Sequence, residues 1–163
     1  MNRKGSGMDI IYILSFLFTF AIVTIVAITF YNGYTDSIAD TEVFDNAANE
    51  QIEAQAVATL HAWDYLFVFI LIGLTITTLM GGFMLRTHPA FFWISLLLLI
   101  IAIVLGAVLG NVFGAVTSTA AFGNASDQLN IIPFFMNHLP LMILLIGSVI
   151  LVILYAKNRM MEY

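Results

Sequence analysis

The chain has 163 residues, of which 61% are hydrophobic and only 9% are charged, and its formal net charge is −5. Soluble domains carry about a quarter charged residues, so this composition excludes an ordinary water-soluble fold and predicts an integral membrane protein. Five Lys and Arg residues cannot form the basic surface that nucleic-acid binding requires. The chain has no Cys, which excludes disulfides and thiolate metal ligands.

The first hydrophobic segment covers about residues 10–31, between Asp9 and Asp36. A bilayer core about 30 Å thick needs about 20 helical residues, so this segment is long enough to span. We expect it to be retained, because its apolar stretch exceeds the length typical of a signal peptide and no Ala-x-Ala-like cleavage site follows. The preceding "RKGSGMD" resembles the N-terminus of archaeal type IV pilin-like precursors, although a pilin has no further spans.

An acidic segment follows the first span. "DSIADTEVFDNAANEQIE", residues 36–53, holds six acidic residues and no Lys or Arg. Its apolar residues recur at helical spacing, which predicts an amphipathic outer helix over about residues 40–60, before the second span. The apolar stripe packs on the bundle or the membrane surface, or receives a partner. It consists of Val43, Phe44, Ala47, Ala48, Ile52, Ala56 and Leu60.

Three more segments are predicted to span the membrane. The second covers about residues 65–85 and the third about residues 90–116, after "THP". The fourth covers about residues 139–156 and has Pro140 near its start. Because Pro would kink a longer helix, we expect a short interfacial piece over "IIPFFMNH" and then the span. The predicted fold is therefore all-α: one transmembrane domain, residues 1–163, built as a four-helix membrane bundle with an outer helix.

The basic residues predict the orientation of this bundle. Lys and Arg near membrane spans stay on the cytoplasmic side. With four spans, all five lie on one side: they are Arg3, Lys4, Arg86, Lys157 and Arg159. We therefore expect both termini to be cytoplasmic, and residues 32–64 and 117–138, which contain no Lys or Arg, to lie outside.

The third span carries a candidate helix-packing face. Gly106, Gly110 and Gly114 follow one another at four-residue spacing, with Asn111 beside them. Small residues on one helix face let a second helix approach closely in lipid, and Asn can hydrogen-bond across helices. The face is suited to a specific oligomer interface, or to packing against the other spans of the same chain. The pair Gly81 and Gly82, and Gly147, are suited to a similar role.

Residues that could support chemistry are few. His61 and Asp64 share a helix face, and His138 belongs to the same outer boundary, so a zinc site of two His and one carboxylate is conceivable. No His-Glu-x-x-His pattern occurs, and the spans contain no ionisable residue. We therefore expect no catalytic residues, metal or cofactor. Thr75, Thr77 and Thr78 could line a narrow path, but Thr in a helix more often bonds to its own backbone.

Two stretches resemble small uncharacterised membrane proteins of bacteriophages and archaeal viruses. They are "HPAFFWISLLLLIIAIVLGAVLGNVF" and "IPFFMNHLPLMILLIGSVILVILYAKNR". The resemblance implies a component of a lipid-containing virion or of a virus-modified host membrane. Helix-packing features are abundant and no catalytic pattern was recognised, so we favour a non-enzymatic structural or assembly protein. Its expected partners are the lipid bilayer and a second copy or another membrane or capsid protein, but no nucleic acid. The alternative is an oligomeric pore, holin-like or a small channel.

Overall fold

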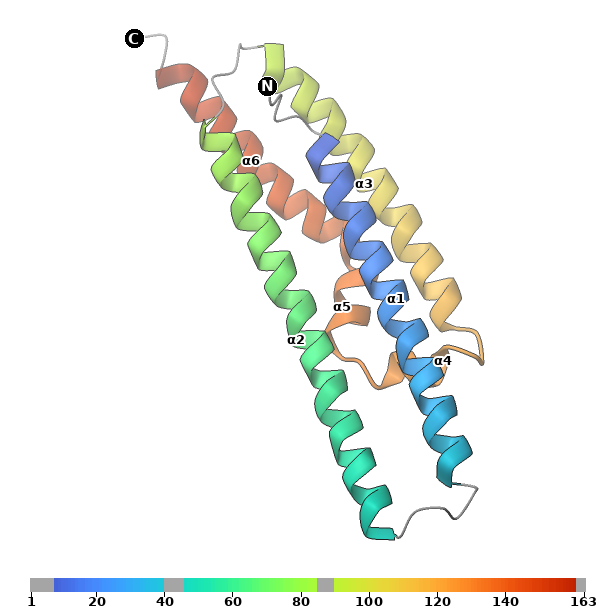
Figure 1. Ribbon diagram of the computed structural model, residues 1–163. Coiled ribbons are helices and arrows are strands. Elements are labelled where there is room, and N and C mark those ends of the chain that lie inside the picture. The colour runs from blue at the N-terminus through green and yellow to red at the C-terminus, as the bar shows by residue number, and fades with distance from the viewer. Residues whose placement is uncertain (1–7, 40–45, 85–89, 161–163) are drawn as a thin grey trace.

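The computed structural model describes residues 8–39, 46–84 and 90–160, and all its regular elements there are helices. Long apolar runs form helices in lipid because each backbone N–H and C=O must be satisfied within its own segment. Figure 1 shows an elongated bundle with the long helices side by side. The elements are α1 (Met8–Ala39), α2 (Asn46–Met84), α3 (Ala90–Thr117), α4 (Gly123–Asp127), α5 (Ile131–Asn137) and α6 (Leu139–Met160).

The four long helices run alternately up and down. Helix α1 packs against α2 and α3, and α6 packs against α3 and α2, while the short α5 lies among α1, α2 and α3. The start of α1 and the end of α6 lie at one end of the bundle (Figure 1). We call the other end, where α1 ends and α2 begins, the α4 end. There α1 and α2 extend beyond α4 and α5 (Figure 1).

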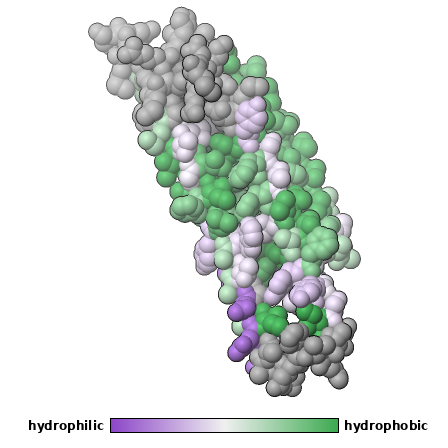
Figure 2. Space-filling view, in the orientation of Figure 1, coloured by the Kyte–Doolittle hydropathy of each residue, from purple (hydrophilic) through white to green (hydrophobic). Residues whose placement is uncertain are grey.

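Three helices are long and apolar enough to cross a membrane: α1, α2 and α3. Helices α5 and α6 form a fourth candidate when the pair counts as one span, although the two are bent by 74° at their junction. The predicted spans fall in these helices, and the protein is accordingly an all-helical membrane protein. Figure 2 shows apolar surface over the middle of the molecule and hydrophilic residues gathered toward the α4 end.

The predicted outer helix and second span form one helix. Helix α2 is continuous from Asn46 to Met84, while residues 40–45, where the outer helix was expected to begin, lie outside the described residues. Of the expected apolar stripe, Leu60 is buried and Ile52 is half-buried. The stripe therefore contacts the rest of the bundle near Leu60.

The core follows one face of α1 and the inner residues of α5. Buried residues recur along α1 every three or four positions, as on one helix face: Leu14, Leu17, Ala21, Ile25 and Ile28. Phe67 of α2 and Phe113 of α3 are fully buried beside Ile132 and Met136 of α5. The short helix expected before the last span is α5, and it buries Ile132 and Met136 in the core while Phe134 remains exposed.

Candidate functional site

The glycines of α3 are not equivalent. Gly106 is buried, and a Cβ placed there would clash with the Cδ1 atom of Ile143 on α6. A Cβ at Gly110 would lie 2.9 Å from the carbonyl oxygen of Met136 on α5. At Gly114 a Cβ would meet nothing within 4 Å. Two of the three predicted glycines thus face other helices of the same chain, and the third faces open space.

The close approach at Gly110 depends on the break between α5 and α6. Pro140 has no N–H with which to continue the helical hydrogen bonds onto Met136, four residues earlier. The backbone turns at His138, and Met142 donates to the carbonyl of His138 (3.1 Å) as α6 begins. The carbonyl of Met136 therefore lies against α3, where a glycine gives it room.

Glycine also lets α3 approach α6 from the opposite direction. Gly147 of α6 is buried, and a Cβ there would clash with the side chain of Leu99 on α3. Each helix therefore supplies one glycine, and the other supplies the branched side chain that lies over it. Such contacts replace lipid by protein at van der Waals distance, which is a main source of helix association in membranes.

Asn111 lies beside this contact and is exposed. Together with Gly110, Gly114 and Asn137 it lines a shallow groove of about 240 Å³ between α3 and the α5–α6 junction. The four predicted packing residues therefore divide into two groups. Gly106 and Gly110 lie inside the bundle contact, while Asn111 and Gly114 lie on its open side.

Asp64 has a role that the sequence analysis did not assign. Its carboxylate is 3% exposed and accepts hydrogen bonds from the backbone N–H groups of Asn130 (2.8 Å), Ile131 (3.0 Å) and Ile132 (3.1 Å). These are donors at the start of α5, which a helix leaves without partners. Asn130, the N-cap residue, makes no side-chain cap. Asp64 of α2 therefore caps α5 from another helix.

The described His and Asp side chains do not form the zinc site that the sequence suggested. Asp64 is committed to backbone donors, and the Nδ1 atom of His138 lies 2.8 Å from the carbonyl oxygen of Phe134, in its own turn. The His138 ring also lies against that of Phe134, with centroids 4.6 Å apart. His61 is exposed on α2. Among the described residues, no three His, Asp or Glu side chains are close enough to hold a metal ion.

The hydroxyl groups of α2 are used within the helix. Thr75, Thr77 and Thr78 each donate to the carbonyl four residues earlier, at 2.7–2.8 Å. Thr24, a buried polar residue of α1, does the same to Phe20 (2.9 Å). The hydroxyl hydrogens are therefore used within the helices, as is usual for Thr in a helix. In the described part of the chain, no buried side-chain N or O atom lacks a hydrogen-bond partner.

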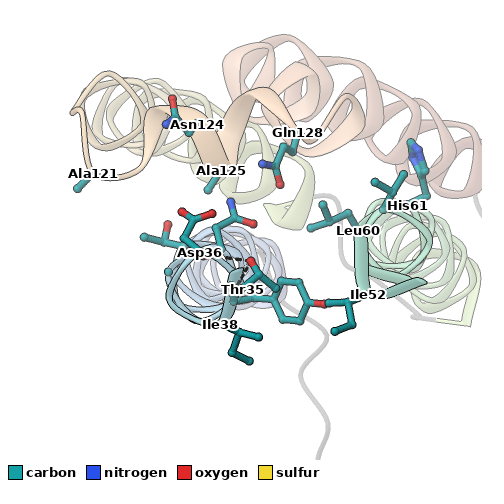
Figure 3. A pocket seen from close by; sticks show the side chains of 15 residues that line it. Thr35, Asp36, Ile38, Ile52, Leu60, His61, Ala121, Asn124, Ala125 and Gln128 are labelled. Carbon is teal, nitrogen blue, oxygen red and sulfur yellow. Dashed lines mark hydrogen bonds between the residues drawn. The ribbon is translucent and has the colours of Figure 1, made fainter. Parts of the chain in front are cut away.

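A recess lies at the α4 end, between α1, α2 and α4, and we call it the outer cleft. Its volume is about 680 Å³. Figure 3 shows Asp36 of α1 and Gln128 near α4 within it, with Ile52 and Leu60 on the α2 side. The hydroxyl of Thr35 donates to the carbonyls of Tyr31 and Asn32. The lining thus combines one carboxylate, several amides and aliphatic side chains.

No protein-family model, curated protein or solved structure matches the chain. Its own residues present three features: a close glycine contact between α3 and α6, an Asp64 cap that holds α5, and the outer cleft. The first two hold the bundle together. The cleft combines a volume of about 680 Å³ with exposed polar side chains such as Asp36, Asn124 and Gln128, and it is the best candidate for a functional site.

Proposed function

We propose that the protein is a four-span membrane protein with both termini cytoplasmic, and that it has a structural or assembly role and catalyses no reaction. It occupies a membrane and presents the α4 end to partners outside. The observation that carries this proposal is how the polar groups of α2 are used. The buried carboxylate of Asp64 and the hydroxyls of α2 are bonded to backbone.

The surface supports the same role. Side chains on the outer faces of α2, α3 and α6 are apolar and exposed, as lipid-facing residues are: examples are Phe69, Trp93, Leu97, Leu145 and Val152. Hydrophilic residues gather toward the α4 end (Figure 2). A partner from water would therefore meet the α4 end first. The resemblance to small viral membrane proteins favours a lipid-containing virion or a virus-modified host membrane as its setting, with a capsid or membrane protein as partner.

Dye release from liposomes tests this role against the pore alternative. Purified protein is reconstituted into liposomes that contain carboxyfluorescein at a self-quenching concentration, with a lytic peptide as positive control. A structural protein leaves the dye trapped. A pore releases it, and release that is lost in Thr77→Val or Asn111→Ala but kept in Ser148→Ala would replace the structural role by the pore. All three residues are exposed, on α2, α3 and α6 respectively, and Ser148→Ala is the control for the loss of a small polar group.

Cross-linking tests the structural role directly. In the native membrane, a structural or assembly component is recovered in a complex of fixed stoichiometry with a second copy or with another membrane or capsid protein. Recovery of the cross-linked chain only as a monomer, at every cross-linker concentration, would contradict the role. The dye-release assay on the reconstituted protein then distinguishes a structural complex from an oligomeric pore, because only the pore releases dye.

A further inference from the structure

The outer cleft is built from parts of the chain that are far apart in sequence. Helix α1 contributes Asn32 and Asp36, α2 contributes Ile52 and Leu60, and α4 and its flanks contribute residues such as Gln128. The volume of about 680 Å³ lies within the range of about 300–1,000 Å³ found for binding sites. Leu60 is buried at the edge of the core, so the α2 wall is fixed to the bundle.

The charge around this cleft is of one sign. Residues 32–64 and 117–138 hold eight of the ten acidic residues and no Lys or Arg. Asp64 is occupied by the start of α5, whereas Asp36 is exposed in the cleft lining. Neither segment has a Lys or Arg to pair with Asp36, and the imidazole in the lining is that of His61. The field at the α4 end therefore attracts cations and repels anionic groups.

We propose that the outer cleft binds a Lys- or Arg-bearing peptide segment of a partner protein. Asp36 pairs with the cationic side chain, because a charge-assisted hydrogen bond to a carboxylate is among the stronger polar contacts. The amides of Asn32, Asn124 and Gln128 offer donors and acceptors for peptide backbone, and Ile52 and Leu60 offer an apolar wall. This inference rests on the proposed function, since it gives the outer surface its partner.

The lining favours a peptide over other cations. Among its described residues there is one carboxylate, Asp36, beside amides, hydroxyls, the imidazole of His61 and aliphatic side chains. A divalent metal or a polyamine would be held mainly by several carboxylates. Anionic lipid headgroups are disfavoured by the negative charge of the α4 end. A peptide uses all three kinds of group at once, because it carries a charge, backbone amides and apolar side chains.

Fluorescence anisotropy tests the proposal on the full chain in nanodiscs of phosphatidylcholine, which has no net charge. The probe is a fluorescein-labelled hexapeptide of alternating Arg and Leu. We expect saturable binding that is absent from empty nanodiscs. The same peptide with Glu in place of Arg should not bind. Absence of saturable binding by the Arg peptide would overturn the proposal.

Three variants locate the binding. Asp36→Asn should weaken it about tenfold, and Ala121→Trp should abolish it, because Ala121 is an exposed lining residue and the indole would fill the cleft. Asp127→Asn is the matched control: it removes the same charge from an exposed residue outside the lining, and it should change binding less than twofold. Thermal unfolding of each variant verifies that it is folded.

Other results contradict the proposal in distinct ways. Equal weakening by Asp36→Asn and Asp127→Asn would show attraction to the whole acidic end and no cleft site. Binding that survives Ala121→Trp would place the peptide elsewhere, and displacement by spermidine at concentrations as low as those of the unlabelled peptide would identify a polyamine site. Dye release is independent of these results. If the protein retains dye but binds no peptide, only the cleft proposal is wrong. If it releases dye, the structural role is wrong.

Discussion

Asp64 shows how one residue joins two helices of the bundle. Removing its carboxylate in Asp64→Ala leaves three N–H groups at the start of α5 without this acceptor, of which that of Ile132 is buried, and an unsatisfied buried group costs about 1–3 kcal/mol. We therefore expect thermal unfolding in detergent at a clearly lower temperature. Asp64→Asn keeps the shape but loses one acceptor oxygen, so its effect should be intermediate.

The control for this prediction is another acidic residue at the same end. Asp127 is exposed, and Asp127→Ala should change the free energy of unfolding by no more than about 0.5 kcal/mol, as surface substitutions usually do. If Asp64→Ala unfolded no earlier than Asp127→Ala, the cap would contribute nothing. The sequence indicated that Asp64 lies just before the second span, but not which groups its carboxylate binds. The donors lie 66 to 68 residues away, and hydropathy carries no information on how α5 is placed against α2.

The glycines of α3 give a graded series at the residue scale. Gly110→Ala places a methyl group 2.9 Å from a backbone carbonyl, which cannot rotate away, and overpacking of this kind costs about 1–3 kcal/mol. Gly106→Ala meets the end of the flexible Ile143 side chain, so its cost should be smaller. Gly114→Ala meets open space and should be neutral or stabilising by up to about 1 kcal/mol, because Ala favours helix.

Thermal unfolding of the three variants under one condition checks this order. Equal destabilisation at Gly110 and Gly114 would show that the four-residue spacing, rather than the local contact, determines the cost. The spacing predicted a packing face, but it could not rank its members. The ranking depends on the break at His138, which brings the carbonyl of Met136 to Gly110.

At the scale of elements, α2 provides a test of rigidity across the membrane boundary. Gln51 and Thr77 are exposed near opposite ends of one continuous helix. Twenty-six residues at about 1.5 Å each place them about 39 Å apart. Spin labels attached at Gln51→Cys and Thr77→Cys should give a narrow distance distribution near this value in pulsed electron paramagnetic resonance. A broad distribution or a clearly shorter distance would indicate a hinge between the outer part and the span.

The positions of the helices were largely predictable, but their ends were not. Apolar runs located the spans because lipid requires about 20 apolar residues to cross it. Helix α1 nevertheless continues past the expected end near residue 31 to Ala39, and the predicted outer helix and second span are joined in the single helix α2. Beyond the apolar stretch, the polar residues of both helices keep their helical hydrogen bonds. Hydropathy identifies only the apolar stretch and therefore does not show where such a helix ends.

For the whole molecule, the order in which the helices pack could not be predicted. Apolar residues surround the spans on all sides, so no stripe marks an inner face. The neighbours are determined by local shape, such as Leu99 over Gly147 and Ile143 over Gly106. The outer cleft escaped prediction for the same reason, since it exists only where the ends of α1 and α2 meet the α4 segment.

The topology of the whole chain gives the last prediction. The chain has no Cys, so single Cys residues can be placed at the exposed positions Gln51, Asn124 and Ala156. In the sequence, every Lys and Arg residue precedes α1, lies between α2 and α3, or belongs to the last part of α6, and positive residues remain cytoplasmic. An impermeant thiol reagent added to intact cells should therefore label Gln51→Cys and Asn124→Cys, and label Ala156→Cys only after permeabilisation. Reversed labelling would invert the orientation. Labelling of all three from outside would mean that the bent α5–α6 pair does not cross the membrane, which would leave three spans.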